Sequence, residues 1–195
     1  MRRFLPLLFL SAVVSLAVGF AIGVSYNSSR LKEQPVRADF KPSLPDAGIA
    51  PVKVYFSHDE KIANRLKEAI SQAKSTIDIA IFDMDSEPIA WALCAKKENV
   101  KIRIVMDRRQ SGQSDSQYRF LKANRLMVRR IGGKKGGIMH NKMAIFDDNL
   151  VMTGSYNFTG GAEENNYENA IFIMDKKIVR QYQEVFETLW NKAKE

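Results

Sequence analysis

The chain of 195 residues has little cysteine and little histidine, and both shortages exclude kinds of site. Cys94 is the only cysteine, so a single chain can form neither a disulfide framework nor a zinc site of several cysteines. Because Cys94 stands within an apolar stretch, we expect it to be a small buried side chain of a helix. The two histidines are His58 and His140, and any chemistry that requires an imidazole must use one of them.

Acidic residues are scarce in the middle of the chain. Between residues 100 and 142, twelve Lys and Arg stand against Asp107 and Asp115, a local excess of +10 in a chain whose formal net charge is +8. Such a segment predicts a polyanionic partner. The alternative is a solvated basic surface that binds nothing, because basic surfaces are common.

Charged residues are absent from residues 4–24, which are mostly apolar and follow two arginines. The segment is long enough to span a bilayer, whose apolar core requires about 20 helical residues. We therefore expect residues 1–24 to be a signal anchor that holds the protein in a membrane through residues 4–24. A cleaved signal peptide stays open as the alternative, because Gly19 and Ala21 form a small-x-small site.

The charges that flank this segment predict its orientation. Arg2 and Arg3 favour retention of the N-terminus in the cytoplasm, which places the rest of the chain in the periplasm or outside the cell. Basic residues behind the segment weaken this prediction; they are Arg30, Lys32 and Arg37. Cleavage of the segment would release the protein in secreted form.

The composition changes beyond the apolar segment. Residues 25–51 are rich in Ser, Asn and Pro, which favours a flexible tether. Residues 52–195 alternate strand and helix patterns, which predicts one α/β domain with a mixed, mostly parallel β-sheet flanked by helices. The expected strands comprise residues 52–56, 76–84, 101–107 and 127–131, a hairpin around residue 148, and residues 167–174.

Capping boxes and apolar periodicity mark the expected helices. Ser57 with Glu60 forms one box, and Ser114 with Gln117 repeats its spacing. A further helix is expected around residues 88–97. The closing helix shows apolar residues at helical spacing, namely Ile178, Tyr182, Phe186 and Leu189.

Residues 138–159 read IMHNKMAIFDDNLVMTGSYNFT, which has the alternating pattern of a β-hairpin. A two-residue turn at residues 148–149 aligns two pairs of polar residues across the hairpin, namely Lys142 with Ser155 and His140 with Asn157. Opposite residues of an antiparallel pair share a face, with Cβ atoms about 5 Å apart. The pattern therefore predicts a cluster of four polar side chains, unless a bulge at Gly154 shifts the register.

Asp147 differs from this cluster in its position. It has the opposite parity along the strand and lies beside the turn. The pattern therefore predicts a supporting role for Asp147 instead of contact with a substrate.

The expected cluster suits phosphoryl chemistry. An imidazole can attack phosphorus, and fixed Lys and Asn donors can stabilise the charge of the transition state. A histidine nucleophile divides hydrolysis into two steps through a covalent phosphohistidine. Such a histidine requires a carboxylate that sets its tautomer, and Glu168 is the candidate. The alternative for a lone strand histidine is an ordinary structural residue.

His140, Lys142 and Asp147 stand in the spacing H-x-K-x4-D, and GSYNFT follows. This combination resembles the phospholipase D superfamily, especially its small single-motif bacterial endonucleases and the mitochondrial membrane-anchored relative. The resemblance extends over residues 52–190 and implies the phospholipase D fold and a phosphodiesterase that needs no metal and no cofactor. His140 matches the nucleophile. The other residues match supporting positions: phosphate holders Lys142 and Asn157, donor Ser155, orienting carboxylate Glu168 and structural residue Asp147.

The leaving oxygen requires a proton donor, which larger relatives take from a second motif that this chain lacks. His58 has no H-x-K pattern around it, so a polar residue at a helix start is the favoured interpretation. A homodimer supplies both roles if two His140 residues face each other across a twofold axis. The single-motif relatives are built in this way, so the resemblance implies a homodimer with a shared active site.

Two basic loops, residues 107–113 and 131–138, flank the motif region. Their cations can contact backbone phosphates without reading sequence; they are Arg108, Arg109, Lys134 and Lys135. The alternative is that both loops are plain turns.

We expect a sequence-nonspecific nuclease on DNA or RNA. A phospholipase D, favoured by the apolar N-terminal segment, is the alternative, and an inactive binding protein is the third hypothesis.

Overall fold

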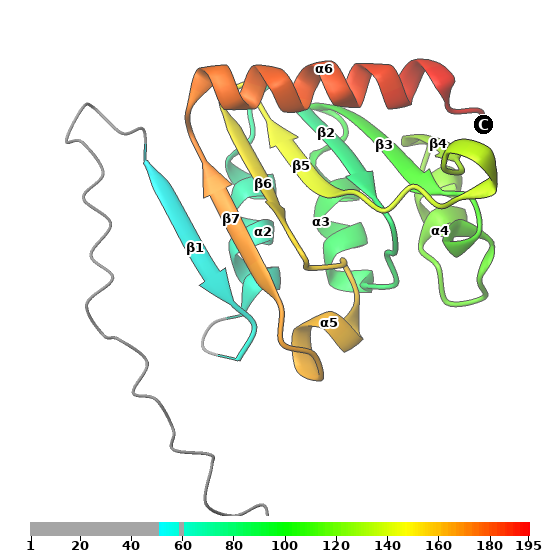
Figure 1. Ribbon diagram of the computed structural model, residues 1–195, viewed down its shortest axis with the longest axis horizontal. Coiled ribbons are helices and arrows are strands. Elements are labelled where there is room, and N and C mark those ends of the chain that lie inside the picture. Colours follow the sequence, from blue (N-terminus) through cyan, green and yellow to red (C-terminus); the bar gives the residue numbers. More distant parts are fainter. Residues whose placement is uncertain (1–50, 59–60) are drawn as a thin grey trace, which may run out of the picture. The chain divides into compact units, whose positions relative to one another are not determined.

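The computed structural model describes residues 51–58 and 61–195. Within this part of the chain, seven strands form one sheet of order β1-β7-β6-β5-β2-β3-β4 (Figure 1). The strands are β1 Val52–Phe56, β2 Thr76–Ile81, β3 Lys101–Asp107, β4 Met127–Ile131, β5 Lys142–Phe146, β6 Leu150–Gly154 and β7 Asn169–Ile173. The helices are α2 Ile62–Gln72, α3 Glu87–Lys96, α4 Tyr118–Ala123, α5 Gly160–Glu164 and α6 Lys176–Lys192, with short 3-10 helices at Gln110–Gly112 and Lys134–Gly136.

The sheet is mixed, as predicted, but the prediction that it is mostly parallel is wrong for its neighbouring strands. β2, β3 and β4 are parallel neighbours, whereas β1, β7, β6, β5 and β2 form successive antiparallel pairs. The difference arises because β5, β6 and β7 insert between β1 and β2. A strand-helix-strand pattern predicts the direction of two strands, but it does not say whether they become neighbours.

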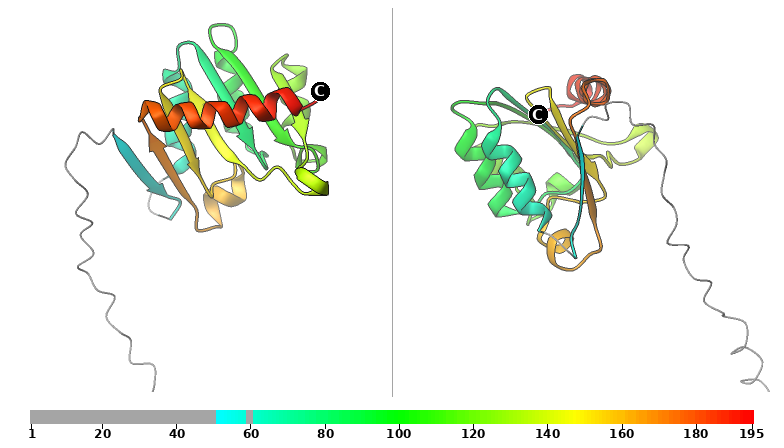
Figure 2. Two further views of the ribbon diagram at one scale, coloured as in Figure 1. Left: turned by 45° about the horizontal axis from the view of Figure 1, so that its top comes forward. Right: turned by 90° about the vertical axis from the view of Figure 1, so that its left-hand side faces the viewer.

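Helices cover both faces of the sheet, with α2 and α3 on one face and α6 across the other (Figure 2). The core under α2 and α3 includes Leu66 and Ile79, and Cys94 is buried there, as predicted. The core under α6 includes Val179 and Phe186. The predicted amphipathic closing helix is therefore confirmed, and burial of its apolar stripe supplies much of its stability.

Two helices begin later in the chain than the capping boxes predict. α2 begins at Ile62 and α4 at Tyr118. Ser57 caps neither helix, because its hydroxyl donates to the carbonyl oxygen of Asn166 at 2.6 Å and accepts from the N–H of Glu168 at 2.9 Å. A capping box is a local pattern, so it cannot reveal a partner that lies far along the chain.

The structure does not test the predictions made for the N-terminal segment. The predicted signal segment, residues 1–24, lies outside the described residues, as does the predicted tether up to residue 50. Among the residues that the structure does describe, no helix has the length and apolar character needed to cross a membrane.

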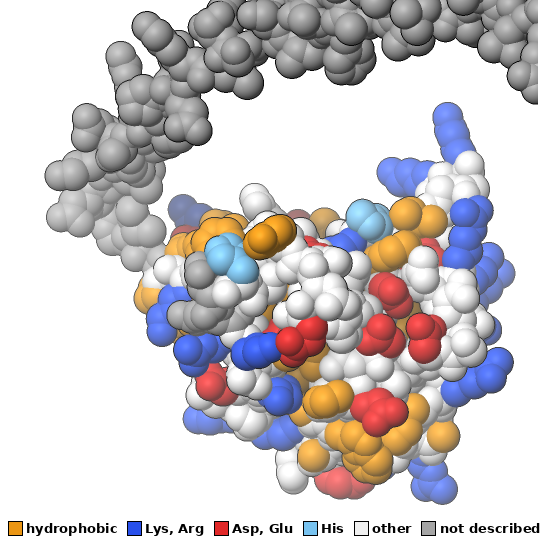
Figure 3. Space-filling view, turned by 90° about the horizontal axis from the view of Figure 1, so that it is seen from below, with side chains coloured by type: hydrophobic (Ala, Val, Ile, Leu, Met, Phe, Trp, Pro, Cys, Tyr) orange, Lys and Arg blue, Asp and Glu red, His pale blue; other side chains and the backbone are white. Residues whose placement is uncertain are grey.

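Both histidine side chains reach one face of the domain, which Figure 3 shows from below.

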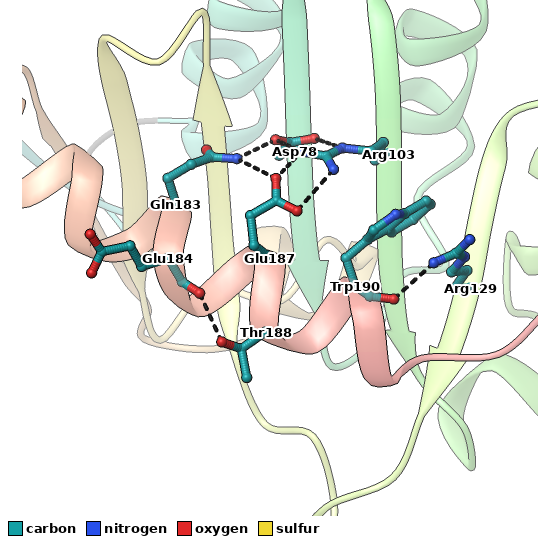
Figure 4. A network of polar contacts seen from close by, with 8 residues as sticks. All are labelled: Asp78, Arg103, Arg129, Gln183, Glu184, Glu187, Thr188 and Trp190. Atoms are coloured by element: carbon teal, nitrogen blue, oxygen red, sulfur yellow. Dashed lines mark hydrogen bonds and ion pairs between the residues drawn. The ribbon is translucent and has the colours of Figure 1, made fainter.

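A polar network joins α6 to the sheet (Figure 4). The guanidinium of Arg103 on β3 donates to Asp78 on β2 at 2.8 and 2.7 Å and to Glu187 on α6 at 3.2 and 2.6 Å. Gln183 on α6 donates to Asp78 at 2.7 Å. Asp78 is 3% exposed, and a buried carboxylate is stable only with such partners. The network therefore holds α6 in one orientation across the strands.

Candidate active site

The hairpin that carries the motif residues has a different register from the predicted one. Phe146 on β5 pairs with Leu150 on β6, so residues 147–149 form a three-residue turn instead of a two-residue turn. Asp147 and Asp148 adopt left-handed φ angles of 53° and 50°, which Asp tolerates. The predicted pairs are therefore wrong by one residue; they were Lys142 with Ser155 and His140 with Asn157.

A close backbone approach at Gly154 joins the end of β6 to the start of β7. Gly154 has a φ of 153°, and a Cβ there would lie 2.2 Å from the carbonyl oxygen of Asn169. Ser155 then donates a hydrogen bond to the carboxylate of Glu168, to which Asn166 also donates at 3.2 Å. The Ser155 oxygen accepts from the N–H of Asn169 at 3.1 Å. Ser155 and Glu168 thus form one unit beside a contact that requires glycine.

His140 and Lys142 contact each other at the start of β5. Nζ of Lys142 is 3.0 Å from Nε2 of His140 and donates to the His140 carbonyl oxygen at 3.3 Å. The Phe82 ring supports both residues, since its centroid lies 4.6 Å from that of the imidazole and 5.0 Å from Nζ. An ammonium has only donors, so Nε2 must present its lone pair to Lys142. The neutral imidazole then carries its proton on Nδ1.

Charges connect this pair to the rest of the site. Burial lowers the pKa of the Lys142 ammonium, and the carboxylates of Glu168 and Asp83 oppose that effect. Burial raises the pKa of the Asp83 carboxyl, Asp85 raises it further, and Lys142 counteracts both. Lys142 is therefore close enough to both carboxylates for their charges to act on it.

The segment after β2 holds both arms of the hairpin. The N–H of Phe82 donates to the carbonyl oxygen of Asn141 at 2.8 Å, and the N–H of Phe158 donates to that of Asp83 at 3.1 Å. Sequence reasoning missed Phe82 and Asp83 as site residues. Their only sequence signal is a polar residue, Asp83, directly after the apolar end of a strand, which is typical of a strand end near a site.

Asn157 lies between two buried aromatic residues, Tyr156 and Phe158. Its Oδ1 atom is buried, and no donor within the described part of the chain reaches it. A buried oxygen without a hydrogen bond costs about 1–3 kcal/mol. The amide of Asn157 therefore keeps unused hydrogen-bonding capacity after folding, although no described contact joins it directly to His140 or Lys142.

Asp147 lies at the opposite end of β5 from His140. Its carboxylate accepts hydrogen bonds from the N–H groups of Lys74, Ser75 and Thr76 at 2.7 to 3.1 Å, and from the Ser75 hydroxyl at 2.8 Å. Burial alone would raise its pKa, but these hydrogen bonds outweigh burial and lower the pKa to about 2. Asp147 therefore anchors the loop before β2, which favours the predicted supporting role.

The two basic loops meet at Asp107, the last residue of β3. Its carboxylate is fully buried and accepts from the N–H groups of Arg109 at 2.8 Å, Gln110 at 3.2 Å and Met139 at 2.8 Å. Asp107 thereby ties the loop after β3 to the residue that precedes His140. A change in the loop after β3 would therefore act on the backbone next to His140 through the Asp107 carboxylate.

A basic pocket of about 470 Å³ lies between these loops. Three of the four predicted loop cations line it, namely Arg108, Arg109 and Lys134, whereas Lys135 does not. Lys192, near the end of α6, lines the same pocket. Sequence reasoning missed Lys192, because no local pattern reveals that the last turn of a distant helix lies beside these loops.

His58 does not start a helix, so the favoured interpretation of this residue is wrong. α2 begins four residues later at Ile62. The imidazole instead contacts the ring of Phe56, with centroids 5.9 Å apart, and the ring of Tyr167, with centroids 5.6 Å apart. These contacts place His58 with the ends of β1 and β7 and not in the pair formed by His140 and Lys142.

The fold and this arrangement of polar residues point to one class of protein. Residues 66–190 match the family model described as "Cardiolipin synthase, PLD-like domain". The match spans more than half of the chain, so the chain belongs to the phospholipase D superfamily of phosphodiesterases. The family predicted from the H-x-K-x4-D motif is thereby confirmed.

Individual relatives show how similar the sequence is to other members of this superfamily. The chain is 34% identical over 161 residues to a phospholipase D of Rickettsia conorii, with 80% of this chain and 70% of the relative covered. It is 32% identical over 134 residues to the human mitochondrial cardiolipin hydrolase, with 68% of this chain and 52% of the relative covered. The chain thus spans about half of the length of that relative, and 57% of its canine counterpart.

Solved structures show the same fold. Nuc from Salmonella typhimurium, a phospholipase D family member, aligns with a TM-score of 0.68 and 29% identity over 74% of this chain and 96% of that one. NucT from Helicobacter pylori aligns with a TM-score of 0.66 and 26% identity over 73% of this chain and 98% of that one. The described domain therefore corresponds to nearly the whole of these two chains.

Proposed function

We propose that the protein hydrolyses phosphodiesters without a metal ion, through a covalent phosphohistidine on His140. The observation that carries this proposal is the contact between Nζ of Lys142 and Nε2 of His140. A phosphodiester oxygen that binds the ammonium of Lys142 is brought beside the lone pair of Nε2. Such positioning converts attack on phosphorus into a reaction within one complex.

The reaction has two steps. In the first, Nε2 of His140 forms a bond to phosphorus, the bond from phosphorus to the leaving oxygen breaks, and a donor protonates that oxygen. In the second, the donor, now deprotonated, takes a proton from water, the water oxygen attacks phosphorus, the phosphorus–nitrogen bond breaks and His140 is regenerated. Lys142 and the amide of Asn157 hold the non-bridging oxygens, on which charge must be stabilised in the transition state.

Ser155 and Glu168 support these groups. The carboxylate of Glu168 acts on the charge of Lys142 and accepts the hydroxyl of Ser155. Within the described residues, no hydrogen bond joins Glu168 to His140, so the orienting role that the family resemblance implies stays a prediction.

The missing proton donor leads us to infer a homodimer with a shared active site. His140 is exposed, so a second copy can approach it, and closed twofold dimers are the commonest oligomers. Analytical ultracentrifugation of the active protein at nanomolar concentration tests this inference. Full activity in a monomer would exclude the shared site and direct attention to His58.

We favour nucleic acid as the substrate, cleaved without sequence preference. The basic pocket collects cations from three segments, and such cations bind a phosphate backbone without reading bases. The alternative substrate is a phospholipid, which the names of the Rickettsia and mitochondrial relatives favour. Anchoring through residues 4–24, with the catalytic domain in the periplasm or outside the cell, rests on the sequence of that segment alone.

One experiment separates the substrates. The full chain is incubated in EDTA with single-stranded DNA, RNA and phospholipid vesicles at equal phosphate concentration, at low and at physiological salt. We expect cleavage of nucleic acid to be faster and to weaken steeply with salt, by a slope of about −0.7 to −0.9 in log K for each neutralised phosphate. Faster hydrolysis of vesicles, with nucleic acid intact at low salt, would establish the phospholipase.

A further inference from the structure

Three exposed rings gather beside the candidate active site. Phe56 ends β1, His58 follows it, and Tyr167 precedes β7; the His58 ring contacts the other two. Phe56 is 45% exposed and Tyr167 is 89% exposed. We call these three residues the aromatic platform. A tyrosine that is almost fully exposed gains little from packing, and a group of exposed rings marks a surface that is available to a ligand.

The aromatic platform is fixed to Glu168 through the backbone. The N–H of Ser57 donates to the carbonyl oxygen of Glu168 at 3.0 Å, and its hydroxyl accepts from the N–H of Glu168 at 2.9 Å. Ser57 lies between Phe56 and His58, and Glu168 directly follows Tyr167. Both halves of the platform are therefore held at constant separation from the side chain that acts on Lys142. Figure 3 shows that both histidines open to this one face.

The charges around the platform limit its ligand. Residues 160–168 contain Glu163, Glu164 and Glu168 and no Lys or Arg, and Lys61 pairs with Glu164 at 2.6 Å, so this segment has no excess of positive charge that would attract phosphate or an anionic lipid surface. The cations lie at the other side, in the pocket lined by Arg108 and Lys192. A ligand that extends across the site therefore places neutral, planar groups on the platform and phosphates in the basic pocket.

We propose that the aromatic platform is a base-stacking subsite for single-stranded nucleic acid. This proposal rests on the proposed function and names its substrate class more closely. Bases of a single strand can turn outward and stack on aromatic rings, whereas bases of a duplex are already stacked on one another. A second copy of the chain is a poorer fit, because a stable dimer buries about 800 Å² per partner and three exposed rings offer less area than that.

The test measures cleavage of a short single-stranded oligonucleotide with one cleavable phosphodiester and resistant linkages elsewhere. A set of such substrates carries an abasic sugar at each position in turn on both sides of the cleavable linkage. We expect the full chain to lose about tenfold in kcat/KM at one or two abasic positions, since stacking of one base contributes about 1–3 kcal/mol. Equal cleavage of all abasic substrates by the parent protein would overturn the subsite.

Variants assign the effect to the platform. Tyr167→Ala should lose about tenfold on the intact substrate and nothing on the sensitive abasic substrate, while Tyr167→Phe keeps the preference because it keeps the ring. Trp91→Ala is the matched control, because Trp91 is 59% exposed on α3 and packs on Phe120 instead. An equal loss on intact and abasic substrates in Tyr167→Ala would refute the proposal.

The competing occupants give different results. Loss of the dimer in Tyr167→Ala, seen by sedimentation together with equal loss on every substrate, would make the platform a subunit interface. Loss of vesicle binding with an unchanged abasic profile would make it a lipid contact. Either result would exclude the stacking subsite. If the parent protein hydrolyses vesicles and no nucleic acid, the proposed nuclease function fails; if it cleaves intact and abasic strands equally, only the subsite fails.

Discussion

The two ends of β5 carry polar residues of one sequence motif but treat them differently. At one end, the carboxylate of Asp147 accepts three backbone N–H groups and a hydroxyl. At the other end, His140 and Lys142 contact each other, and His140 is exposed. A carboxylate saturated with internal donors has no capacity left for a ligand, whereas a ligand can replace the single contact between the exposed His140 ring and the Lys142 ammonium. Saturation therefore separates the supporting end of the motif from its reactive end.

The largest effect is expected at the reactive end. His140→Ala should lower kcat by about 10⁴-fold or more, because it removes the proposed nucleophile. The melting temperature should change by no more than about 2 °C, because the side chain is exposed. Cleavage assays and thermal melts of the purified variant test both expectations. Substantial activity in a folded His140→Ala protein would eliminate the phosphohistidine mechanism.

The opposite behaviour is expected at the supporting end. Asp147→Asn replaces an acceptor oxygen with a donor facing backbone N–H groups, and should destabilise the protein by about 2 kcal/mol, or about 4–8 °C in Tm. The kcat per active site should stay near that of the parent. Active-site titration separates this rate from the fraction folded. An unchanged melt combined with lost chemistry would show that both ends of β5 are catalytic.

The pH dependence of the free energy of unfolding gives a second test of the role of Asp147. The pKa of Asp147 is about 2 in the folded protein, below its ordinary value of 3.8. Folding therefore gains stability from this group above pH 3.8, and the gain is lost as the pH falls toward 2. Denaturant unfolding at several pH values should show the difference between the parent and Asp147→Asn shrinking over this range. A constant difference would mean that the charge of Asp147 does not stabilise the fold.

The smallest effect concerns the basic pocket near the reactive end. Lys192→Ala should reduce the slope of log K against log salt by about 0.7–0.9, the contribution of one phosphate contact. Lys177→Ala is the matched control, because Lys177 lies exposed in the first turn of the same helix. Binding is measured with a non-cleavable oligonucleotide at several salt concentrations. Equal slopes for the two variants would remove Lys192 from the binding surface.

In the motif region, the sequence predicted the family correctly but not the register of the hairpin. The H-x-K-x4-D spacing predicted the family, because such a motif preserves the chemistry that a site needs. The predicted hairpin was real, but its register was wrong by one residue. Turn length depends on whether Asp147 takes a left-handed φ, and in this fold its carboxylate bonds to residues 74–76. That partner lies far along the chain, so no pattern within the hairpin could reveal it.

The sequence by itself determined which chemical groups are available: one histidine in an H-x-K pair, a single cysteine that is buried, and a concentration of positive charge in the middle of the chain. Periodicity also determined most strands and the amphipathic face of α6. Only the tertiary structure decided which groups meet. It placed Phe82 under His140, Lys192 beside the basic loops and Tyr167 against His58. Each of these contacts joins segments far apart in the chain, and such contacts follow from the packing of the whole sheet instead of from local preference.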